Sequence, residues 1–566
     1  MEAAASLLNG ERAVVVMFLS RIVMYAESSV LYESLALVLL AVCALVVETR
    51  AEAPGRISSL KTRPGASCGV MLGAVTLPAV LVSKMIQQSR GYLLGEIELE
   101  ELEYLKLQYW ATAACCFCVL LFVAFVSKVS SASKNSLMQN CWDVKFCIIC
   151  VASFTALCSL SLITTHGWGL LATLKLFYVF CHGFAAVKVI QHIIHTFFSC
   201  ASIGEALLVT SGLIHYFGDM IACTVTEICR RLVSSGLVSA QFGINRSEIS
   251  TIIQGTLFGL LLFPFLFKFL VRIWGHFSSS FNLDSRKYEI GRALVFYVFL
   301  SFIVIGIIPM WMQFVQEFSR HPILWIVGFV FSEPYKRLSL CIHWVGLIGV
   351  AVLRFYSISK HSKVERILLR KYYHLLAVCM FVPALIYQPM FLDLAFGAAL
   401  AVFLVLEIIR IWRIWPLGQL VHKFMTAFTD HRDSDILIVS HFSLLLGCAL
   451  PIWMSSQYND RPLALFAGIL ILGIGDTMAS MVGHKYGVLR WSKTGKKTIE
   501  GTAAGITSML AASLSLLPLL ASTGYLVTES WFPLVFAVTV SGLLEAYTAQ
   551  LDNAFIPLVF YSLLCL

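Results

Sequence analysis

The sequence contains few charged residues. Only 13% of its 566 residues are Asp, Glu, Lys or Arg, whereas 59% are hydrophobic. A soluble protein of this length could not bury so much apolar surface, so the composition excludes a soluble globular fold. Apolar runs long enough to span a bilayer recur at 109–127, 144–164, 257–274, 293–315, 338–354, 436–455 and 531–547, among others. We therefore predict an all-α, polytopic membrane protein with about 14–16 transmembrane helices.

Several common signatures are also missing. No cleavable signal peptide is expected, because Arg21 interrupts the first apolar stretch (13–25) and no small-residue cleavage site follows. The 17 cysteines show no metal-ligand spacing with histidine partners, which favours buried apolar thiols over disulfides or zinc ligands. Neither a Walker A motif nor the protein-kinase signature set occurs, so any phosphoryl transfer must use another scaffold.

Polar residues are concentrated in the second half of the chain. We divide the sequence into an N-terminal multi-span region (1–355) and a region of concentrated chemistry (356–566). The first region could form lipid access or a scaffold, and its Glu205 in GEALLV suits either a functional site or a helix start at the interface. The net charge of +9 suits anionic lipid or a phosphorylated substrate without choosing between them.

Basic loops indicate the membrane topology of this second half. They occur at 360–371, 410–432 and 485–497, and the intervals 373–409 and 436–483 each have room for two spans. A turn near Gln388 and Pro389 would divide the first pair. Two spans return the chain to the same face, so the positive-inside rule makes all three loops cytosolic. The polar residues therefore converge on one face of the membrane.

Residues 476–501 carry the strongest functional signal. If 463–483 is helical, Asp476, Ala479 or Ser480, Gly483 and Gly487 form one stripe of small side chains. A nucleotide or a neighbouring helix could approach such a stripe closely, and Gly483-x-x-x-Gly487 also fits a helix-packing seam. A carboxylate near the end of an apolar run is costly, which favours a polar or metal-holding role for Asp476.

A basic helix entry follows this stripe. Lys496, Lys497 and Thr498 precede Glu500 and Gly501, just before the next apolar run. Backbone N–H groups at a helix start favour anions, and paired lysines would strengthen the binding of a polyphosphate. The lysines would otherwise be ordinary positive charges beside a span. Glu500 could hold a metal ion or fix a lysine.

Two further segments contain candidate residues. In RKYYH (370–374), Arg370, Lys371 and His374 could clamp phosphate or place an imidazole near a hydroxyl, or the segment could be an interfacial anchor. In LLEAYTAQLDN (543–553), Glu545 and Asp552 lie on similar helical faces, and either could be a second metal ligand.

These motifs resemble the dolichol kinase family of polyprenol kinases, most closely its plant members. The family's nucleotide-site pattern, Asp-x-x-Ala-x-x-x-Gly-x-x-x-Gly, eight residues, then Lys-Lys-Thr-x-Glu-Gly, is matched without departure from Asp476 to Gly501. Other segments that resemble the family are 370–374, 416–418, 432–434, 451–453 and 543–553. The strong resemblance covers about 365–566.

The resemblance implies a reaction and a location. CTP would donate its γ-phosphate to the terminal hydroxyl of dolichol, giving the dolichyl phosphate used in N-glycosylation and mannose transfer at the endoplasmic reticulum. The active site would face the cytosol, with a polyprenol substrate and membrane lipid as partners and no nucleic acid.

Roles for individual residues follow as expectations. Asp476, with Glu500 or Asp552, would hold a divalent cation (Mg²⁺ or Ca²⁺), and Lys496 and Lys497 would bind the β- and γ-phosphates. His374, or a carboxylate, would accept the dolichol proton as general base. The remaining residues of the proposed CTP site are Ala479, Ser480, Gly483, Gly487, Thr498, Glu500, Gly501, Arg370 and Lys371.

Other functions remain alternatives. A kinase for phytol or another polyprenol differs only in its acceptor, and a cytidylyltransferase that forms a CDP-lipid would release pyrophosphate in place of CDP. A transporter would show internal repeats and polar residues near the midplane in both halves, and neither is evident.

Overall fold

The computed structural model describes residues 9–52, 63, 67–131, 137–197, 200–232, 246–280, 285–361, 366–426, 437–455, 459–491, 497–524 and 531–566. Within these ranges the chain is helical and no strand is formed; a single isolated β-bridge joins Arg490 to Thr498. The predicted all-α fold is therefore confirmed.

The helices pack in two compact units. Unit 1 comprises Met1–Asp219, Gly349–Val382 and Gly447–Leu566, and unit 2 comprises Met220–Ile348 and Pro383–Leu446. Each unit thus combines segments that lie far apart in the sequence. The functional division at residue 355 stays a prediction, because packing groups the chain differently.

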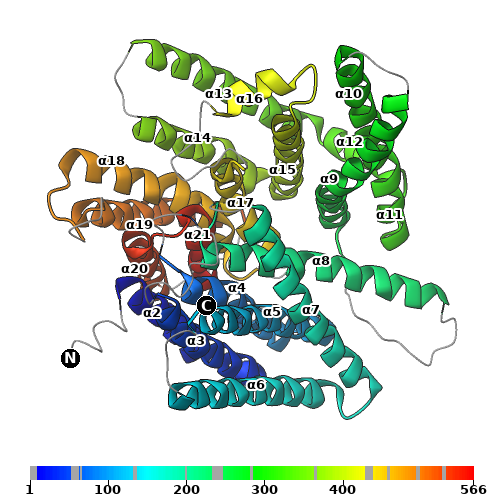
Figure 1. Cartoon of the computed structure of the whole chain (residues 1–566). Coiled ribbons are helices and arrows are strands. Elements are labelled where there is room, and N and C mark those ends of the chain that lie inside the picture. Colours follow the sequence, from blue (N-terminus) through cyan, green and yellow to red (C-terminus); the bar gives the residue numbers. More distant parts are fainter. Residues whose placement is uncertain are drawn as a thin grey trace. The chain divides into compact units, whose positions relative to one another are not determined.

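Unit 1 contains the two ends of the described chain. Its elements are α2 (Gly10–Met24), η1 (Ser28–Val30), α3 (Leu31–Ala51), α4 (Val70–Leu93), α5 (Leu99–Ser131), α6 (Leu137–His166), α7 (Leu170–Thr196), most of α8 (Ile203–Leu232), η3 (Pro462–Phe466), η4 (Ile469–Gly475), α18 (Asp476–Tyr486), α19 (Ile499–Ser522), α20 (Trp531–Tyr547) and α21 (Asp552–Leu564). In Figure 1 the red helices α20 and α21 lie against the blue helices α2 and α4. The last helices of the chain therefore pack on the first.

Unit 2 is built from the middle of the chain. Its elements are α9 (Glu248–Ser280), α10 (Ser285–Phe302), the π-helix η2 (Ile303–Ile307), α11 (Ile308–Val315), α12 (Pro322–Ser332), α15 (Pro389–Trp412) and α16 (Gly418–Thr426). Besides α8, three helices contribute residues to both units, namely α13 (Pro334–His361), α14 (Arg366–Tyr387) and α17 (Val439–Met454). Within unit 2, the Arg410 guanidinium donates to both carboxylate oxygens of Glu407 at 2.7 Å.

The helix lengths agree with a polytopic membrane protein. Among the described residues, 11 helices are long and apolar enough to cross a membrane, and five shorter apolar helices accompany them. The expected number of about 14–16 spans is reached only when the shorter helices also cross. The turn expected near Gln388 is confirmed, since α14 ends at Tyr387 and α15 begins at Pro389.

The stretch 463–483 is not one regular α-helix. It consists of the 3₁₀-helix η3, the π-helix η4 and then α18, which begins at Asp476. The π-helical turns bring Gly473 against another helix, where an added Cβ would lie 2.3 Å from the Val378 side chain. Such π-segments are frequent at functional sites. Here the irregular turn places Asp476 at the start of α18.

Candidate active site

The site centres on the carboxylate of Asp476. The ammonium of Lys371, from α14, donates a hydrogen bond to Oδ2 of Asp476. Nδ1 of His374 lies 3.2 Å from the same oxygen, and Oγ of Ser480 lies 3.4 Å from Oδ1. Asp476 is 5% exposed, so this pair is shielded from water. Residues separated by about a hundred positions in the sequence thus form one polar cluster inside unit 1.

The protonation of His374 follows from its contacts. Its Nδ1 lies 3.0 Å from the backbone carbonyl oxygen of Leu472, which is a pure acceptor. Nδ1 must therefore carry a proton, and in the neutral imidazole Nε2 keeps its lone pair. In the neutral imidazole, Nε2 is therefore the ring nitrogen that can accept a proton.

Acidic and basic groups from three other segments complete the cluster. The ammonium of Lys497 donates to the backbone carbonyl of Glu545, at the end of α20. The carboxylate of Glu545 interacts electrostatically with Lys497, Lys371, Asp476 and Asp552. The cluster therefore combines two lysines with three carboxylates, an arrangement suited to holding a polyphosphate and neutralising its charge.

The small residues of α18 pack against α19. A Cβ added to Gly501 would lie 2.6 Å from the carbonyl oxygen of Ala479 and 3.0 Å from Cα of Gly483. A Cβ at Gly487 would lie 2.6 Å from Oγ1 of Thr498. Figure 1 shows α18 and α19 side by side. The stripe is thus the packing seam that the sequence left as one of two alternatives, and a helix backbone occupies its inner side.

The predicted helix entry is confirmed. Helix α19 begins at Ile499, and Oγ1 of the N-cap residue Thr498 accepts a hydrogen bond from the Gly501 N–H at 3.2 Å. The Glu500 carboxylate accepts from the Leu489 N–H at 3.0 and 3.2 Å. These bonds tie the Glu500 carboxylate to the backbone at Leu489, in the segment that follows α18. The carboxylate is therefore directed to the backbone instead of to Asp476.

The predicted site residues therefore fall into three groups. Asp476, Lys371, His374, Lys497 and Asp552 belong to the charged cluster, together with Ser480. Ala479, Gly483, Gly487, Thr498 and Gly501 form the α18–α19 seam, with Glu500 in the first turn of α19. Lys496, the segment 432–434 and the side chain of Arg370 lie outside the described residues. Their binding and catalytic roles stay predictions.

The carboxylates do not form a ready-made metal cage. Among the described residues, no group of three or more His, Cys, Asp or Glu side chains is placed to hold a metal ion. Mg²⁺ bound with a nucleotide commonly uses one or two carboxylates, with water and phosphate oxygens supplying the rest. Asp476 with Glu545 or Asp552 provides such a donor set beside two lysines, so the residues present fit a metal–nucleotide complex.

A buried hydrogen-bond network fixes the turn that directly precedes Asp552, and the sequence analysis did not predict this network. Glu205 accepts hydrogen bonds from the Leu551 N–H at 2.8 Å and from the Arg63 guanidinium at 2.6 Å. Arg63 also donates to the carbonyl of Ala549 at 3.2 Å. The side chain of Gln550 donates to Ser67 at 2.8 Å and accepts from Ser202. We name this set the turn clamp: Arg63, Ser67, Ser202, Glu205 and Gln550.

The same turn meets the first helix of the chain. Glu11 accepts hydrogen bonds from the Thr548 side chain and the Ala549 N–H. Burial, and then the nearby carboxylate of Glu48, raise the pKa of Glu11 to about 7, against the lowering effect of those bonds. Residues of the N-terminal region thus surround the turn next to the charged cluster.

Comparison with known proteins identifies the family. The family model of dolichol kinase matches residues 184–515, which include Lys371, His374, Asp476 and Lys497. The chain belongs to the dolichol kinase family. It is therefore an enzyme, and the resemblance noted in its motifs is confirmed.

Relatives within the dolichol kinase family cover the chain to different extents. Dolichol kinase EVAN of Arabidopsis thaliana is 56% identical over 567 residues, covering 100% of this chain and 99% of the relative. The dolichol kinase of Homo sapiens is 32% identical over 381 residues, with 64% and 65% of the two chains covered. That of Saccharomyces cerevisiae is 30% identical over 248 residues, 43% of this chain and 44% of the relative. No solved structure matches the chain.

Proposed function

We propose that the chain transfers the γ-phosphate of CTP to the terminal hydroxyl of dolichol and releases dolichyl phosphate and CDP. The observation that carries this proposal is the charged cluster, in which Lys371, Lys497, Asp476 and the imidazole of His374 come together. Two cations suit the β- and γ-phosphates, and carboxylates suit their metal ion. The choice of CTP rests on the family motif from Asp476 to Gly501.

The proposed transfer is a direct in-line displacement. The dolichol oxygen forms a bond to the γ-phosphorus while the bond to the β-phosphate oxygen breaks, and CDP leaves with that electron pair. The hydroxyl proton passes to Nε2 of His374, whose Nδ1–H is held by the Leu472 carbonyl. Lys497 and Lys371 bind the phosphates and neutralise the charge that builds in the transition state.

A divalent cation would be held by Asp476 with Glu545 or Asp552. When bound, it would supply positive charge that stabilises the transferred phosphoryl group. The binding of a metal–nucleotide complex would also give Asp476 a second cationic partner beside Lys371. Lys371 would then be available to contact a phosphate oxygen.

The proposed setting is the endoplasmic reticulum membrane, with the site on the cytosolic face. The concentration of basic loops on this face supports the orientation, because such loops favour the cytosolic side. Dolichol would lie among the apolar helices and raise its hydroxyl to the interface. Its product would serve as the lipid carrier for N-glycosylation and mannosyl transfer.

The donor is tested with purified full-length protein, dolichol and Mg²⁺. We expect label from [γ-³²P]CTP to enter the lipid with equimolar CDP, and label from [α-³²P]CTP to stay in the nucleotide. ATP at the same concentration should give at most about 1% of that rate, because a site that hydrogen-bonds one base rejects another strongly.

Other outcomes identify the alternatives. Transfer of the α-label to lipid with release of pyrophosphate would establish a cytidylyltransferase. Faster labelling of phytol than of dolichol would identify phytol as the preferred acceptor. Folded protein that transfers label from ATP but not from CTP would overturn the proposed donor.

A further inference from the structure

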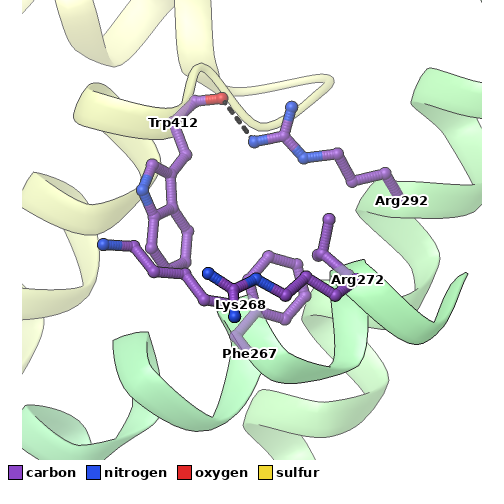
Figure 2. A pocket seen from close by; sticks show the side chains of 6 residues that line it. Phe267, Lys268, Arg272, Arg292 and Trp412 are labelled. Carbon is purple, nitrogen blue, oxygen red and sulfur yellow. Dashed lines mark hydrogen bonds between the residues drawn. The ribbon is translucent and has the colours of Figure 1, made fainter. Parts of the chain in front are cut away.

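Unit 2 contains a cationic pocket that the proposed reaction does not use. Phe267, Lys268, Val271 and Arg272 of α9, Arg292 of α10 and Trp412 of α15 line a cavity of about 170 Å³. Figure 2 shows the side chains of Lys268, Arg272 and Arg292 around the rings of Phe267 and Trp412. Three cations from two helices thus share one small cavity.

These cations differ from several arginines of the same unit that are ion-paired. Arg231, Arg337 and Arg410 pair with Glu227, Glu333 and Glu407, respectively. Among the described residues, no carboxylate forms an ion pair with Lys268, Arg272 or Arg292. The pocket therefore carries positive charge that the described part of the unit does not neutralise.

Aromatic packing makes this pocket rigid. The rings of Phe267 and Trp412 stack with centroids 5.1 Å apart, and Phe263 and Phe296 pack on them. The Trp412 carbonyl accepts a hydrogen bond from the Arg292 guanidinium at 3.3 Å. This bond fixes the guanidinium, while the buried Nε of Arg292 has no hydrogen-bond partner. The Arg292 Nε–H is thus an ordered hydrogen-bond donor that is available to a ligand.

The position of the pocket selects the source of that ligand. In the sequence, the apolar run 257–274 of α9 is followed by the polar connector 275–292, and α15 ends at Trp412, directly before Arg413. Such ends of apolar runs are expected at the membrane boundary, where phospholipid head groups lie. We propose that this pocket binds the phosphate group of an anionic membrane lipid, with Arg272 and Arg292 as its principal contacts.

Native mass spectrometry of the full-length protein tests this site. Delipidated protein is titrated with phosphatidic acid, with phosphatidylcholine, and with inorganic phosphate. The double variant Arg272→Gln/Arg292→Gln should bind phosphatidic acid about tenfold more weakly or worse, because each basic contact contributes to anionic-lipid binding. Lys287→Gln is the matched control, an exposed cation at the start of α10 that does not line the cavity.

Three results would overturn the lipid site. Equal weakening in the control would assign the binding to general surface charge. Unchanged affinity in the double variant would place the lipid elsewhere. Inorganic phosphate that displaces phosphatidic acid at equal concentration would make the ligand a soluble anion.

The turn clamp supports a second, independent inference about the N-terminal region. Its hydrogen bonds end on Ala549, Gln550 and Leu551, directly before Asp552, and Glu545, near the end of α20, lies four residues before Ala549. Asp552 and Glu545 both interact electrostatically with Lys371. A shift of the turn would therefore move two carboxylates of the charged cluster.

The segments around the turn are closely packed. Gly69 has a φ of +59°, and a Cβ there would lie 2.3 Å from the Gln550 side chain. A Cβ at Gly204 would lie 2.0 Å from the Gly69 carbonyl oxygen. The geometry points to Gln550 and Glu205 as positioning residues that set the place of Asp552, an inference that rests on the proposed function.

Two buried glutamines allow a matched test. Gln550→Ala removes the bonds to Ser67 and Ser202, and Gln87→Ala removes bonds of Gln87 to Asn459 and Asp460. Both variants should lose similar thermal stability. Only Gln550→Ala should lower kcat per folded protein, by roughly 10- to 100-fold with little change in KM for dolichol, because small displacements of reacting groups are costly.

The controls separate the two hypotheses. Wild-type protein without CTP-dependent transfer would contradict the proposed function. An active wild type with equal kcat in both glutamine variants would contradict the positioning role. Glu205→Gln, which keeps an acceptor for Leu551 but loses the charge facing Arg63, should show the same fall in kcat as Gln550→Ala.

Discussion

Substitution of Asp476 by asparagine is expected to lower kcat for lipid phosphorylation by about 100- to 1,000-fold, the effect of removing one preorganised electrostatic group. The change preserves side-chain shape but removes the charge that faces Lys371 and His374. The measurement is the initial rate of label transfer from [γ-³²P]CTP to dolichol, normalised to folded protein.

A second effect of this substitution must be separated from the first. Asp476→Asn leaves the shielded ammonium of Lys371 without its anion, and a buried charge that loses its partner is strongly destabilising. The double variant Lys371→Gln/Asp476→Asn removes that charge and should recover thermal stability without recovering turnover. Turnover that returns together with stability would show that Asp476 serves the fold alone.

Substitution of Gly501 by alanine is expected to destabilise the protein by about 1–3 kcal/mol, the usual cost of overpacking a filled interior. The added methyl group would meet the Ala479 carbonyl oxygen at 2.6 Å, and a backbone atom cannot turn aside as a side chain can. The two helices must separate, which would also displace Lys497 and Thr498 at the start of α19. We expect a lower midpoint of thermal unfolding and a higher KM for CTP.

A helical glycine elsewhere in unit 1 provides the control. Gly212 lies within α8, and nothing lies within 4 Å of a Cβ added there. Alanine has the higher helix propensity, so Gly212→Ala should leave stability unchanged or slightly raised. Equal destabilisation by both substitutions would mean that helix packing at Gly501 is not the cause.

The sequence predicts the elements of this site better than their contacts. Asp476 stands out because a carboxylate near the end of an apolar run is costly. Lys497 stands out because it is paired with Lys496 before a helix entry, where Thr498 has the side chain of an N-cap residue. Asp476 and Lys371 lie on two helices and are 105 residues apart in the sequence, so no local sequence pattern predicts their pairing. The same limit applies to Glu545, whose place in the cluster depends on how α20 packs.

The glycines illustrate a different limit. Their spacing is compatible with a nucleotide or a helix backbone beside the stripe, because both need the absence of a Cβ. Only packing decides between them, and here α19 fills the space. The π-helix before Asp476 escaped prediction for a related reason, since hydrophobic periodicity carries no signal for one extra residue per turn.

The turn clamp has a consequence for biosynthesis. The hydrogen bond from Leu551 to Glu205 joins residues 346 positions apart, and that from Gln550 to Ser67 joins residues 483 apart. Translation proceeds from the N-terminus, so Ser67 and Glu205 are synthesised and inserted hundreds of residues before their partners in the turn. Asp552 takes its place only after translation has passed residue 551, and a nascent chain that is hundreds of residues long still lacks an assembled site.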